Sequence, residues 1–477
     1  IDELLAEVDD APAGPGTGAF FDFDGTLIAG YSAQAFYEDR IRRFQMSPGE
    51  VARSLAAGLD MAVNGADVSK LMEVAVANWA GRREDEVREL FDRLFYTRIA
   101  GMVYPEAREL VKAHIRAGHT VALASSATRY QLSALADDLG VANVLCSEVE
   151  LVKGYFSGYI DGPVLWGPAK AHAVTEFAAE HDVDLRRSFA YADGDEDVPL
   201  LETVGNPRAL NPGAGMLKAA REHGWPAVEL GGRGRPGIAD VLRTGAALTG
   251  LGAAGGLGIA VGLLMGDRRT GANLAAAMGP DLALALAGVK LNVSGEQHLW
   301  SHRPAVFIFN HQSSIDVAVI GSLVRRDLTG VAKIEAKRDP RFAPIGYVTD
   351  IVYVDRSNST QARAALKPAV DRLKQGTSIA IAPEGTRSPT PTLGRFKKGA
   401  FHLAMQAGVP LVPVVIRNAG DVMWRGSLVI RPGTIDVAVQ PPISTDGWLV
   451  EELDERISEV HALFERTLEE RPVLTKL

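Results

Sequence analysis

A run of 23 residues without a charged side chain, Thr244 to Gly266, most constrains how this 477-residue chain can fold. A helix of that length can cross the hydrocarbon core of a bilayer. The run holds eight glycines, and both Gly252-x-x-x-Gly256 and Gly258-x-x-x-Gly262 have the spacing typical of closely packed helices. A buried helix of a soluble protein is the alternative interpretation of the same composition.

A second apolar stretch, from Ala272 to Val289, follows Arg268 and Arg269 and is interrupted by Asp281. Together the two stretches predict a helical hairpin over about 244–289 that dips into one leaflet or crosses the bilayer an even number of times. The carboxylate of Asp281 favours the shallower arrangement, because a charged group inside a bilayer is costly.

Short apolar runs that alternate with helical patterns flank this hairpin on both sides. They are Ala19–Phe23, Thr120–Ala124 and Ser188–Ala192 in the first half, and Ala305–Phe309, Ile351–Val354, Ser378–Ala382 and Leu411–Ile416 in the second. Strands separated by helices predict an α/β fold built on parallel sheets, in which ligands bind at the carboxyl ends of the strands.

Changes in composition divide the chain into three parts. Residues 1–230 are expected to form the first α/β domain, in which the helical periodicity of about 31–102 predicts an inserted cap. Residues 231–289 hold a Gly- and Arg-rich linker and the apolar hairpin, and residues 290–477 are expected to form the second α/β domain.

The two halves also differ in charge. Residues 1–289 carry a net charge of −13, whereas residues 290–477 carry +4. A basic second half suits an anionic ligand or a membrane surface. Arginine clusters with interleaved aromatic residues do not occur, so no nucleic-acid partner is expected. The single cysteine, Cys146, excludes a disulfide framework.

Two carboxylates stand at the end of the first predicted strand, in Asp22-Phe-Asp24-Gly-Thr. One can attack phosphorus, and the other can protonate the leaving oxygen and later activate water. Ser125, after the next strand, is a candidate to hold a phosphoryl oxygen, and Lys170 is a candidate to neutralise charge in the transition state.

Further along, Asp193-Gly-Asp-Glu-Asp197 adds oxygen ligands suited to Mg²⁺. In this order the motifs resemble the haloacid dehalogenase superfamily, most closely its phosphoserine-phosphatase-like branch with a helical cap. The resemblance covers about residues 15–230 and implies a Rossmann-like parallel sheet. It also implies that Asp22 is the nucleophile, that Asp24 is the acid/base, and that both bind Mg²⁺ together with Asp193 and Asp197.

A second constellation, Asn310-His311-Gln-Ser-Ser-Ile-Asp316, follows the strand Ala305–Phe309. A neutral histidine can take a proton from an alcohol, and the carboxylate can orient and stabilise the imidazolium. The chain has no Gly-x-Ser-x-Gly elbow, so direct attack by a bound alcohol fits better than an acyl-enzyme. Pro383-Glu-Gly-Thr-Arg-Ser388 offers backbone donors and a guanidinium for a phosphate.

These blocks, with Tyr353-Val-Asp-Arg356 and Val409-Pro-Leu-Val-Pro413, resemble the glycerolipid acyltransferase family over about residues 285–445. The closest match is its 1-acylglycerol-3-phosphate type. The resemblance implies that His311 is the base and Asp316 its partner. It implies an acceptor-phosphate site made by Arg356, Glu384, Gly385, Thr386 and Arg387. An acyl thioester of coenzyme A or acyl carrier protein would be the donor.

The two resemblances predict a bifunctional phospholipid-synthesis enzyme at the cytoplasmic face of a membrane. Its second domain would acylate lysophosphatidic acid to phosphatidic acid, with membrane lipid and acyl carrier protein as further candidate partners. Its first domain would hydrolyse a phosphomonoester, phosphoserine-like or a lipid phosphate, with Mg²⁺. Two alternatives stay open: a catalytically silent first domain that binds a phosphorylated metabolite or positions the acyltransferase, and a phosphatase that acts on the lipid product.

Overall fold

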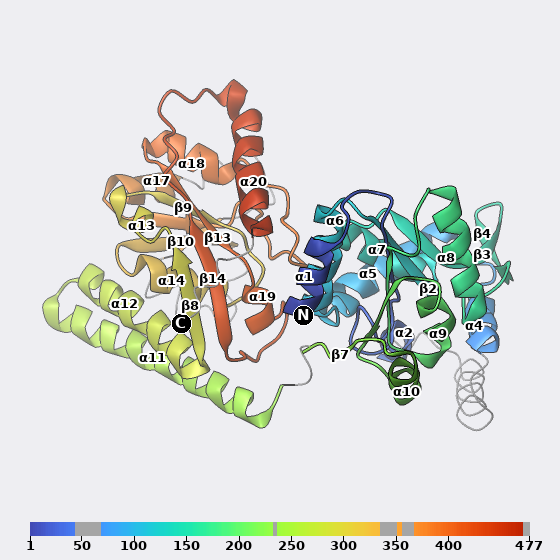
Figure 1. Cartoon of the computed structure of the whole chain (residues 1–477). Helices are drawn as coiled ribbons and strands as arrows, with labels where there is room; N and C mark the ends of the chain where they lie inside the picture. The colour runs from blue at the N-terminus through green and yellow to red at the C-terminus, as the bar shows by residue number, and fades with distance from the viewer. Residues whose placement is uncertain (43–67, 232–235, 334–350, 355–366, 471–477) are drawn as a thin grey trace. The chain divides into compact units, whose positions relative to one another are not determined.

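The computed structural model describes residues 1–42, 68–231, 236–333, 351–354 and 367–470 (Figure 1). The chain groups into two compact units, 1–234 and 235–477. Each unit is built around one sheet of seven described strands, and parallel pairing dominates both sheets, which confirms the predicted α/β class. The boundaries predicted at residues 230 and 289 stay predictions, and the grouping places the apolar hairpin in the second unit.

In the first unit the strand order is β4-β3-β2-β1-β5-β6-β7, and only β3 and β4 pair antiparallel. The strands are β1 (Gly18–Phe21), β2 (Thr120–Thr128), β3 (Asn143–Val152), β4 (Tyr155–Asp161), β5 (Phe189–Ala192), β6 (Asn206–Leu210) and β7 (Ala227–Val228). The chain leaves the central strand β1 towards β2 on one side and later returns to β5 on the other. In sheets of this type ligands bind at such a reversal, at the carboxyl end of the strands, which here is the end of β1.

Helices cover this sheet, and a helical cap is inserted in the chain between β1 and β2. The sheet helices are α1 (Asp2–Asp10), α6 (Pro105–Arg116), α7 (Arg129–Leu139), α8 (Pro168–Glu180), α9 (Val198–Leu201) and α10 (Ala214–His223). The described cap helices are α2 (Ser32–Arg42), α4 (Val68–Ala77) and α5 (Glu84–Thr97), as the periodicity predicted. Residues 43–67 of the predicted cap lie outside the described residues.

The cap is joined to the sheet by a cluster of buried aromatic side chains. Phe36 and Phe91 stack at a centroid distance of 5.3 Å, and Trp79 meets Phe156 edge-on at 5.4 Å. Phe156 belongs to β4, so the β3–β4 hairpin extends the sheet under the cap. The sequence did not predict this hairpin, because its burial pattern becomes mostly exposed towards its end.

In the second unit the order is β11-β10-β12-β9-β13-β14-β8, with β13 and β14 antiparallel. The strands are β8 (Val289–Ser294), β9 (Val306–Phe309), β10 (Leu328–Lys333), β11 (Val352–Val354), β12 (Ser378–Ile381), β13 (Leu411–Ile416) and β14 (Gly433–Val439). The helices besides the hairpin are α13 (His298–Ser301), α14 (Asp316–Val324), α17 (Lys367–Lys374), α18 (Gly399–Ala407), α19 (Ala419–Val422) and α20 (Leu453–Glu469). The central strand β9 lies between β12 and β13, again at a reversal of strand order.

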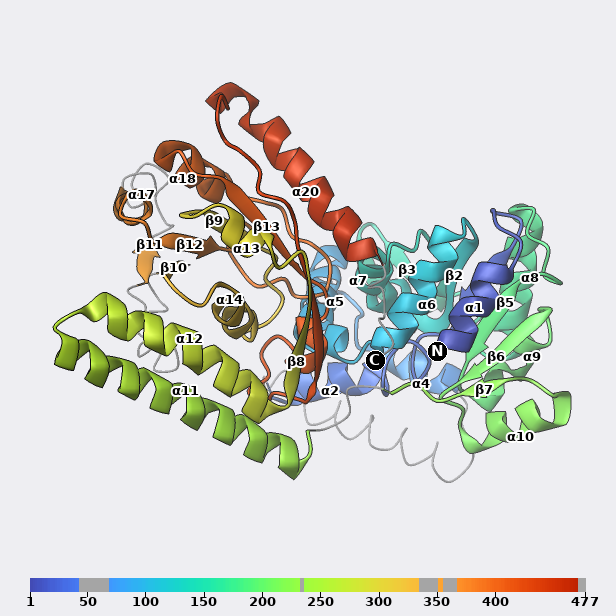
Figure 2. The same cartoon turned by 60° about the vertical axis from the view of Figure 1, so that its left-hand side comes forward.

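The predicted hairpin is confirmed as two antiparallel helices, α11 (Ile238–Met265) and α12 (Arg268–Ala287), which lie side by side in Figures 1 and 2. The turn between them uses Gly266 at a φ of 61° and the carboxylate of Asp267, which caps the first N–H groups of α12. Among the described helices, only α11 is long and apolar enough to cross a membrane by length and composition.

Small residues let the two helices approach closely. Gly250, Ala254 and Gly258 are buried on one face of α11, and a Cβ added at Gly258 would lie 2.8 Å from the Cβ of Ala275. The predicted packing role of Gly258-x-x-x-Gly262 is therefore confirmed. The predicted role of Gly252-x-x-x-Gly256 is wrong, because a Cβ at either position meets no atom within 4 Å.

One glycine face of α11 is packed and the other is open, so replacing glycine by alanine is expected to have opposite effects on stability at the two faces. Gly258→Ala forces a methyl group against the carbonyl of Gly271 and is expected to destabilise the chain by about 1–3 kcal/mol. Gly255→Ala enters open space and is expected to stabilise it by about 0.5–1 kcal/mol, because alanine loses less backbone entropy in a helix. Thermal unfolding in detergent compares the two variants, and equal shifts would contradict the packing assignment.

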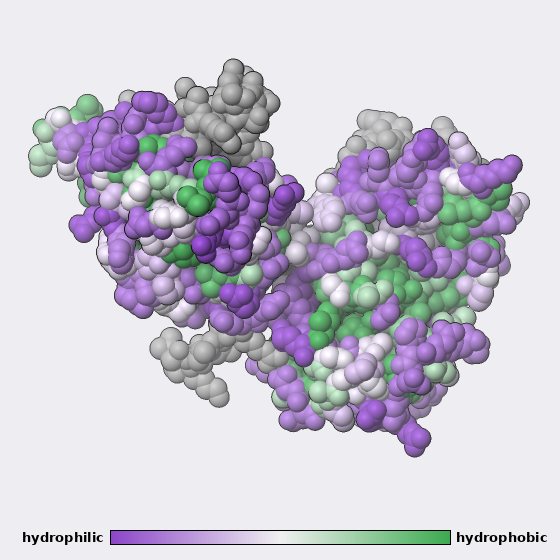
Figure 3. Space-filling view, turned by 90° about the horizontal axis from the view of Figure 1, so that it is seen from above, coloured by the Kyte–Doolittle hydropathy of each residue, from purple (hydrophilic) through white to green (hydrophobic). Residues whose placement is uncertain are grey.

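Hydrophobic side chains remain exposed at the tip of the hairpin, where Leu263, Leu264 and Met265 are 71–86% exposed. This tip lies at the far left of Figure 3. The other side of the hairpin is fastened to the unit, since Asp281 on α12 accepts a hydrogen bond from Ser322 and pairs with Arg325 at 3.1 Å. Both partners lie at the end of α14, so the charge of Asp281 is compensated inside the protein.

Candidate functional sites

The carboxyl ends of β1, β2 and β5 bring the predicted phosphate-transfer residues to one edge of the first sheet. Asp22 and Ser125 are buried there, at 6% and 2% exposure. From α8, Lys170 donates to the Oδ1 of Asp22 at 2.8 Å and lies 2.7 Å from an oxygen of Asp197. Burial disfavours the charge of Lys170, but the two carboxylates outweigh it and raise its pKa above the ordinary value.

Asp24 is held by the first residue of the cap. The backbone N–H and the hydroxyl of Ser32 donate to its two oxygens at 2.6 Å and 3.0 Å. Burial raises the pKa of Asp24 to about 7, although both bonds from Ser32 oppose the shift. A carboxyl group that titrates near neutral pH can both give and take a proton. The sequence did not single out Ser32; its place at the start of a helical pattern was the available signal.

Asp193 lies opposite, after β5, where the hydroxyl of Thr26 donates to it at 2.9 Å. Burial, with the negative charge of Asp22, raises its pKa to about 7. Gly25 has a φ of 84°, and a Cβ there would overlap the carboxylate of Asp193. Only glycine therefore fits at position 25, where the backbone after Asp24 lies against the carboxylate of Asp193.

Asp197 differs from the prediction. It was expected to bind Mg²⁺ directly, but it is 1% exposed and forms the ion pair with Lys170. The ammonium group of Lys170 compensates the charge of this carboxylate, and the role of Asp197 as a Mg²⁺ ligand stays a prediction. The geometry therefore gives Asp197 the task of holding Lys170 beside Asp22.

The remaining carboxylates fit a cation only in part. No cluster of three or more His, Cys, Asp or Glu side chains in the described residues is arranged to hold a metal ion by itself. Mg²⁺, however, commonly binds one or two carboxylates and completes its shell with water and substrate phosphate. Burial raises the pKa of both Asp24 and Asp193, which indicates negative charge that a cation would stabilise. Asp22, Asp24 and Asp193 therefore stay the residues predicted to hold Mg²⁺.

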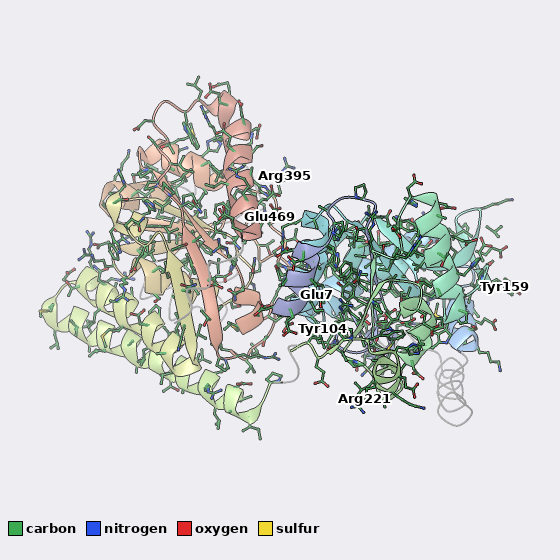
Figure 4. The ribbon with its side chains drawn as sticks, in the orientation of Figure 1. Glu7, Tyr104, Tyr159, Arg221, Arg395 and Glu469 are labelled. Atoms are coloured by element: carbon green, nitrogen blue, oxygen red, sulfur yellow. The ribbon has the colours of Figure 1, made fainter. Side chains whose placement is uncertain are left out.

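Two tyrosines that the sequence analysis did not select face these carboxylates. Tyr31 is 62% exposed, and Tyr104, labelled in Figure 4, precedes α6. Partial burial and the charge of Asp193 raise the pKa of both phenols. No motif distinguishes them in the sequence, because only folding brings them to this edge.

In the second unit the loop after β9 is fixed to its neighbours. Asn310 donates to the carbonyl of Ile416 at 2.7 Å and accepts from its N–H at 2.8 Å, which joins the loop to the end of β13. The Nδ1 of His311 lies 2.9 Å from the Oδ2 of Asp316, the first residue of α14. The same oxygen accepts the backbone N–H groups of Gln312 and Ser313, both at 2.8 Å.

These bonds orient the imidazole and leave its other nitrogen for chemistry. Asp316 is fully buried, whereas the side chain of His311 is 21% exposed. A carboxylate that accepts the Nδ1 proton fixes the tautomer in which Nε2 is the basic nitrogen. The structure thus brings together the two residues predicted as base and partner.

Glu384, after β12, departs from the predicted phosphate contact. One of its oxygens accepts the backbone N–H of His311 at 2.7 Å, and the other accepts that of Gly394 at 2.9 Å. Burial raises its pKa to about 7, against the effect of these two donors. A carboxylate would also repel a phosphate. The geometry makes Glu384 a positioning residue for the loop that carries His311.

Glu384→Gln tests this reassignment. An amide can accept only one of the two N–H groups, so one charge-assisted bond is lost and kcat of acyl transfer is expected to fall roughly 10–100-fold. The KM for the acceptor should change little. An unchanged kcat with a lower KM would instead place Glu384 beside the phosphate, since the change removes a repulsive charge. Steady-state kinetics at pH 8 separate the two outcomes.

The rest of the Glu-Gly-Thr-Arg block lies beside the catalytic loop. Arg387 donates to the hydroxyl of Ser314 at 2.5 Å, and the N–H of Ser388 donates to the carbonyl of His311 at 2.7 Å. Gly385 has a φ of 75°, and Thr386 is exposed. Arg356, the other predicted phosphate ligand, lies outside the described residues.

A further arginine was missed because it belongs to no motif. Arg425 follows α19 and is half-buried. Its pKa is lowered by burial and by the positive charge of Arg387, so the two guanidinium groups are near each other.

Comparison with known proteins identifies a protein family for each of the two units. Residues 19–202 match the haloacid dehalogenase-like hydrolase family, and residues 290–417 match the acyltransferase family. Phosphoserine phosphatase SerB1 of Mycobacterium tuberculosis is 35% identical over 243 residues, which are 49% of this chain and 79% of that protein.

The second half is similar to lipid acyltransferases. The 1-acyl-sn-glycerol-3-phosphate acyltransferase of Limnanthes alba is 33% identical over 188 residues, 39% of this chain and 66% of that enzyme, so slightly under two thirds of it is covered. An uncharacterized acyltransferase of Schizosaccharomyces pombe is 32% identical over 192 residues, 40% of this chain and 69% of that protein. The chain therefore belongs to the haloacid dehalogenase-like hydrolases through its first unit and to the acyltransferase family through its second.

Proposed function

We propose that the second unit transfers an acyl group from a thioester to the free hydroxyl of 1-acylglycerol 3-phosphate, which gives phosphatidic acid. The observation that carries this proposal is the His311–Asp316 pair, with Arg387 held beside the same loop by Ser314. A base and an anion-binding guanidinium on one loop fit an acceptor that carries both a hydroxyl and a phosphate.

In the proposed reaction the Nε2 of His311 accepts the hydroxyl proton while the alcohol oxygen attacks the thioester carbonyl carbon. Asp316 stabilises the imidazolium through Nδ1. When the C–S bond breaks, the imidazolium returns the proton to the leaving thiolate. Arg387, together with Arg356, binds the acceptor phosphate. The donor is acyl-coenzyme A or an acyl carrier protein.

We propose that the first unit hydrolyses a phosphomonoester, either a phosphoserine-like metabolite or a lipid phosphate. Asp22 would attack phosphorus and form an aspartyl phosphate, while Asp24 protonates the leaving oxygen and then activates water. Ser125 and Lys170 would bind phosphoryl oxygens. The contact between Lys170 and Asp22 supports these roles, and it disfavours a silent domain, which needs no such pair.

Mg²⁺ would shield phosphoryl charge in this site, as it generally does in haloacid dehalogenase phosphatases. Asp22, Asp24 and Asp193 are the residues that would hold it. Asp24 and Ser32 then control proton transfer at the leaving oxygen, and the cap that begins at Ser32 limits access of bulk water.

We also propose that the chain associates with the cytoplasmic face of a membrane through the α11–α12 hairpin. The exposed tip at Leu263, Leu264 and Met265 supports this placement, and the fastening of α12 to α14 through Asp281 favours the shallow arrangement. Both units should then lie on one side. Protease treatment of sealed inside-out vesicles is expected to cleave both, and protection of one unit alone would contradict the arrangement.

The decisive test of the two activities uses the full chain in detergent. Acyl transfer is followed with acyl-coenzyme A or acyl carrier protein and lysophosphatidic acid. Phosphate release is followed with Mg²⁺ across phosphoserine, phosphatidic acid and other phosphomonoesters. Absence of phosphate release from every one of them would leave the first unit as a binding module.

A further inference from the structure

We propose that Arg425 also binds the acceptor phosphate, together with Arg387, so that guanidinium groups from separate segments hold one phosphate dianion. The inference rests on the proposed acyltransferase function and extends it to a residue outside every motif. Arg425 would thereby help to select acceptors that carry a phosphate over neutral glycerides.

Two adjacent serines tie the segments that carry these arginines. Ser313 donates to the carbonyl of Met423 at 2.5 Å, and Ser314 accepts from Arg387 at 2.5 Å. Both serines lie between His311 and Asp316, so one hydroxyl links Arg387 to the catalytic loop and the other links the backbone of the segment that carries Arg425. Arg425 stands two residues beyond the first of these links, and Arg387 makes the second.

The charge balance of this region lacks an anion. In the described part of the chain, Arg425 forms no ion pair with a carboxylate, and burial together with Arg387 lowers its pKa. The positive charges of the two half-buried arginines oppose each other until a negative group binds between them. A phosphate monoester supplies that charge and accepts from both planar guanidinium groups.

The segment is also anchored at its other end, to the apolar hairpin. The N–H of Ile430 donates to the hydroxyl of Thr244 in α11 at 2.9 Å, and that hydroxyl donates to the carbonyl of Asp240 at 2.7 Å. Residues 423–430 thus connect the hairpin with the loop of His311.

Kinetics with paired acceptors test the proposal. Arg425→Gln is expected to raise the KM for lysophosphatidic acid roughly 10–100-fold with little change in kcat, because a contact to the remote phosphate is equally strong in ground and transition states. With monoacylglycerol, which lacks the phosphate, the variant should match wild type. Arg425→Lys keeps the charge and should recover part of the loss. Arg466→Gln, an exposed arginine of α20, is the matched control.

Two other phosphate-bearing compounds, acyl-coenzyme A and phosphatidylglycerol, are tested in separate experiments. A raised KM for acyl-coenzyme A alone, or weaker binding to phosphatidylglycerol vesicles alone, would overturn the assignment to the acceptor. An equal loss with monoacylglycerol would show a structural role and also overturn it. Binding of lysophosphatidic acid in detergent is measured in parallel for wild type and Arg425→Gln. If wild type binds the lipid more tightly than the variant but transfers no acyl group, only the proposed activity is refuted. If Arg425→Gln unfolds, the KM for lysophosphatidic acid of Arg425→Lys, measured on a variant with unchanged melting temperature, decides the question.

Discussion

Replacing His311 by alanine is expected to lower the rate of acyl transfer roughly 10²–10⁴-fold, the usual contribution of a general base. The fold should persist, because the imidazole makes one side-chain hydrogen bond, to Asp316, whose oxygen still accepts two backbone N–H groups. Thioester-dependent release of thiol with lysophosphatidic acid measures the rate.

The control for this variant is His302→Ala, which removes an exposed imidazole from the same unit. Phosphate release by the first unit should be unchanged in both variants. An acyl-transfer rate within a few-fold of wild type in His311→Ala would refute the assignment of the base. A fall of both activities with a lower melting temperature would instead show unfolding, and Asp316→Asn, which keeps the shape of the pair, would then test the same mechanism.

Asp22→Asn is expected to abolish phosphate release, with a loss on the order of 10⁴-fold, because an amide cannot form the covalent intermediate. The amide oxygen can still accept from Lys170. The substitution also removes a negative charge that raises the pKa of Asp24 and Asp193. The variant should therefore be at least as stable as wild type, and loss of activity will not reflect unfolding.

Acyl transfer in Asp22→Asn should stay within a few-fold of wild type, because the two sites belong to separate compact units. Asp161→Asn, at an exposed position on β4, is the matched control. If both activities fall together while the melting temperature is unchanged, the two units are coupled. Retained phosphate release would show that another group attacks phosphorus.

The sequence determined the architecture, and it predicted candidate residues for both sites that the structure brings to the strand ends. Continuous apolar runs such as Leu411–Ile416 are buried along their length, and strands of that kind are read from composition alone. Motif residues follow strand ends, so the position of Asp22 or His311 at the edge of a sheet follows from chain order. The hairpin was also predictable from the sequence, because 23 uncharged residues followed by a charged turn are compatible with few other structures.

Tertiary structure decided which groups each motif residue faces. Asp197 pairs with Lys170, and Glu384 holds two backbone N–H groups, although both were expected to contact a ligand. A carboxylate looks the same in sequence whether its partner is a metal ion, an ammonium group or a backbone amide. The packing role predicted for Gly252-x-x-x-Gly256 was wrong for a similar reason, because both glycine pairs of α11 have the same spacing and only packing shows which of them faces α12.

Residues outside the motifs were determined only by folding. Ser32 bonds Asp24 from the cap, Tyr104 before α6 is affected by the charge of Asp193, and Arg425 after α19 is affected by the charge of Arg387. No motif distinguishes Tyr104 or Arg425 in the sequence, and the only sequence signal at Ser32 is its place at the start of a helical pattern. Their proximity to charged groups depends on long-range packing, and a sequence pattern records only neighbours along the chain.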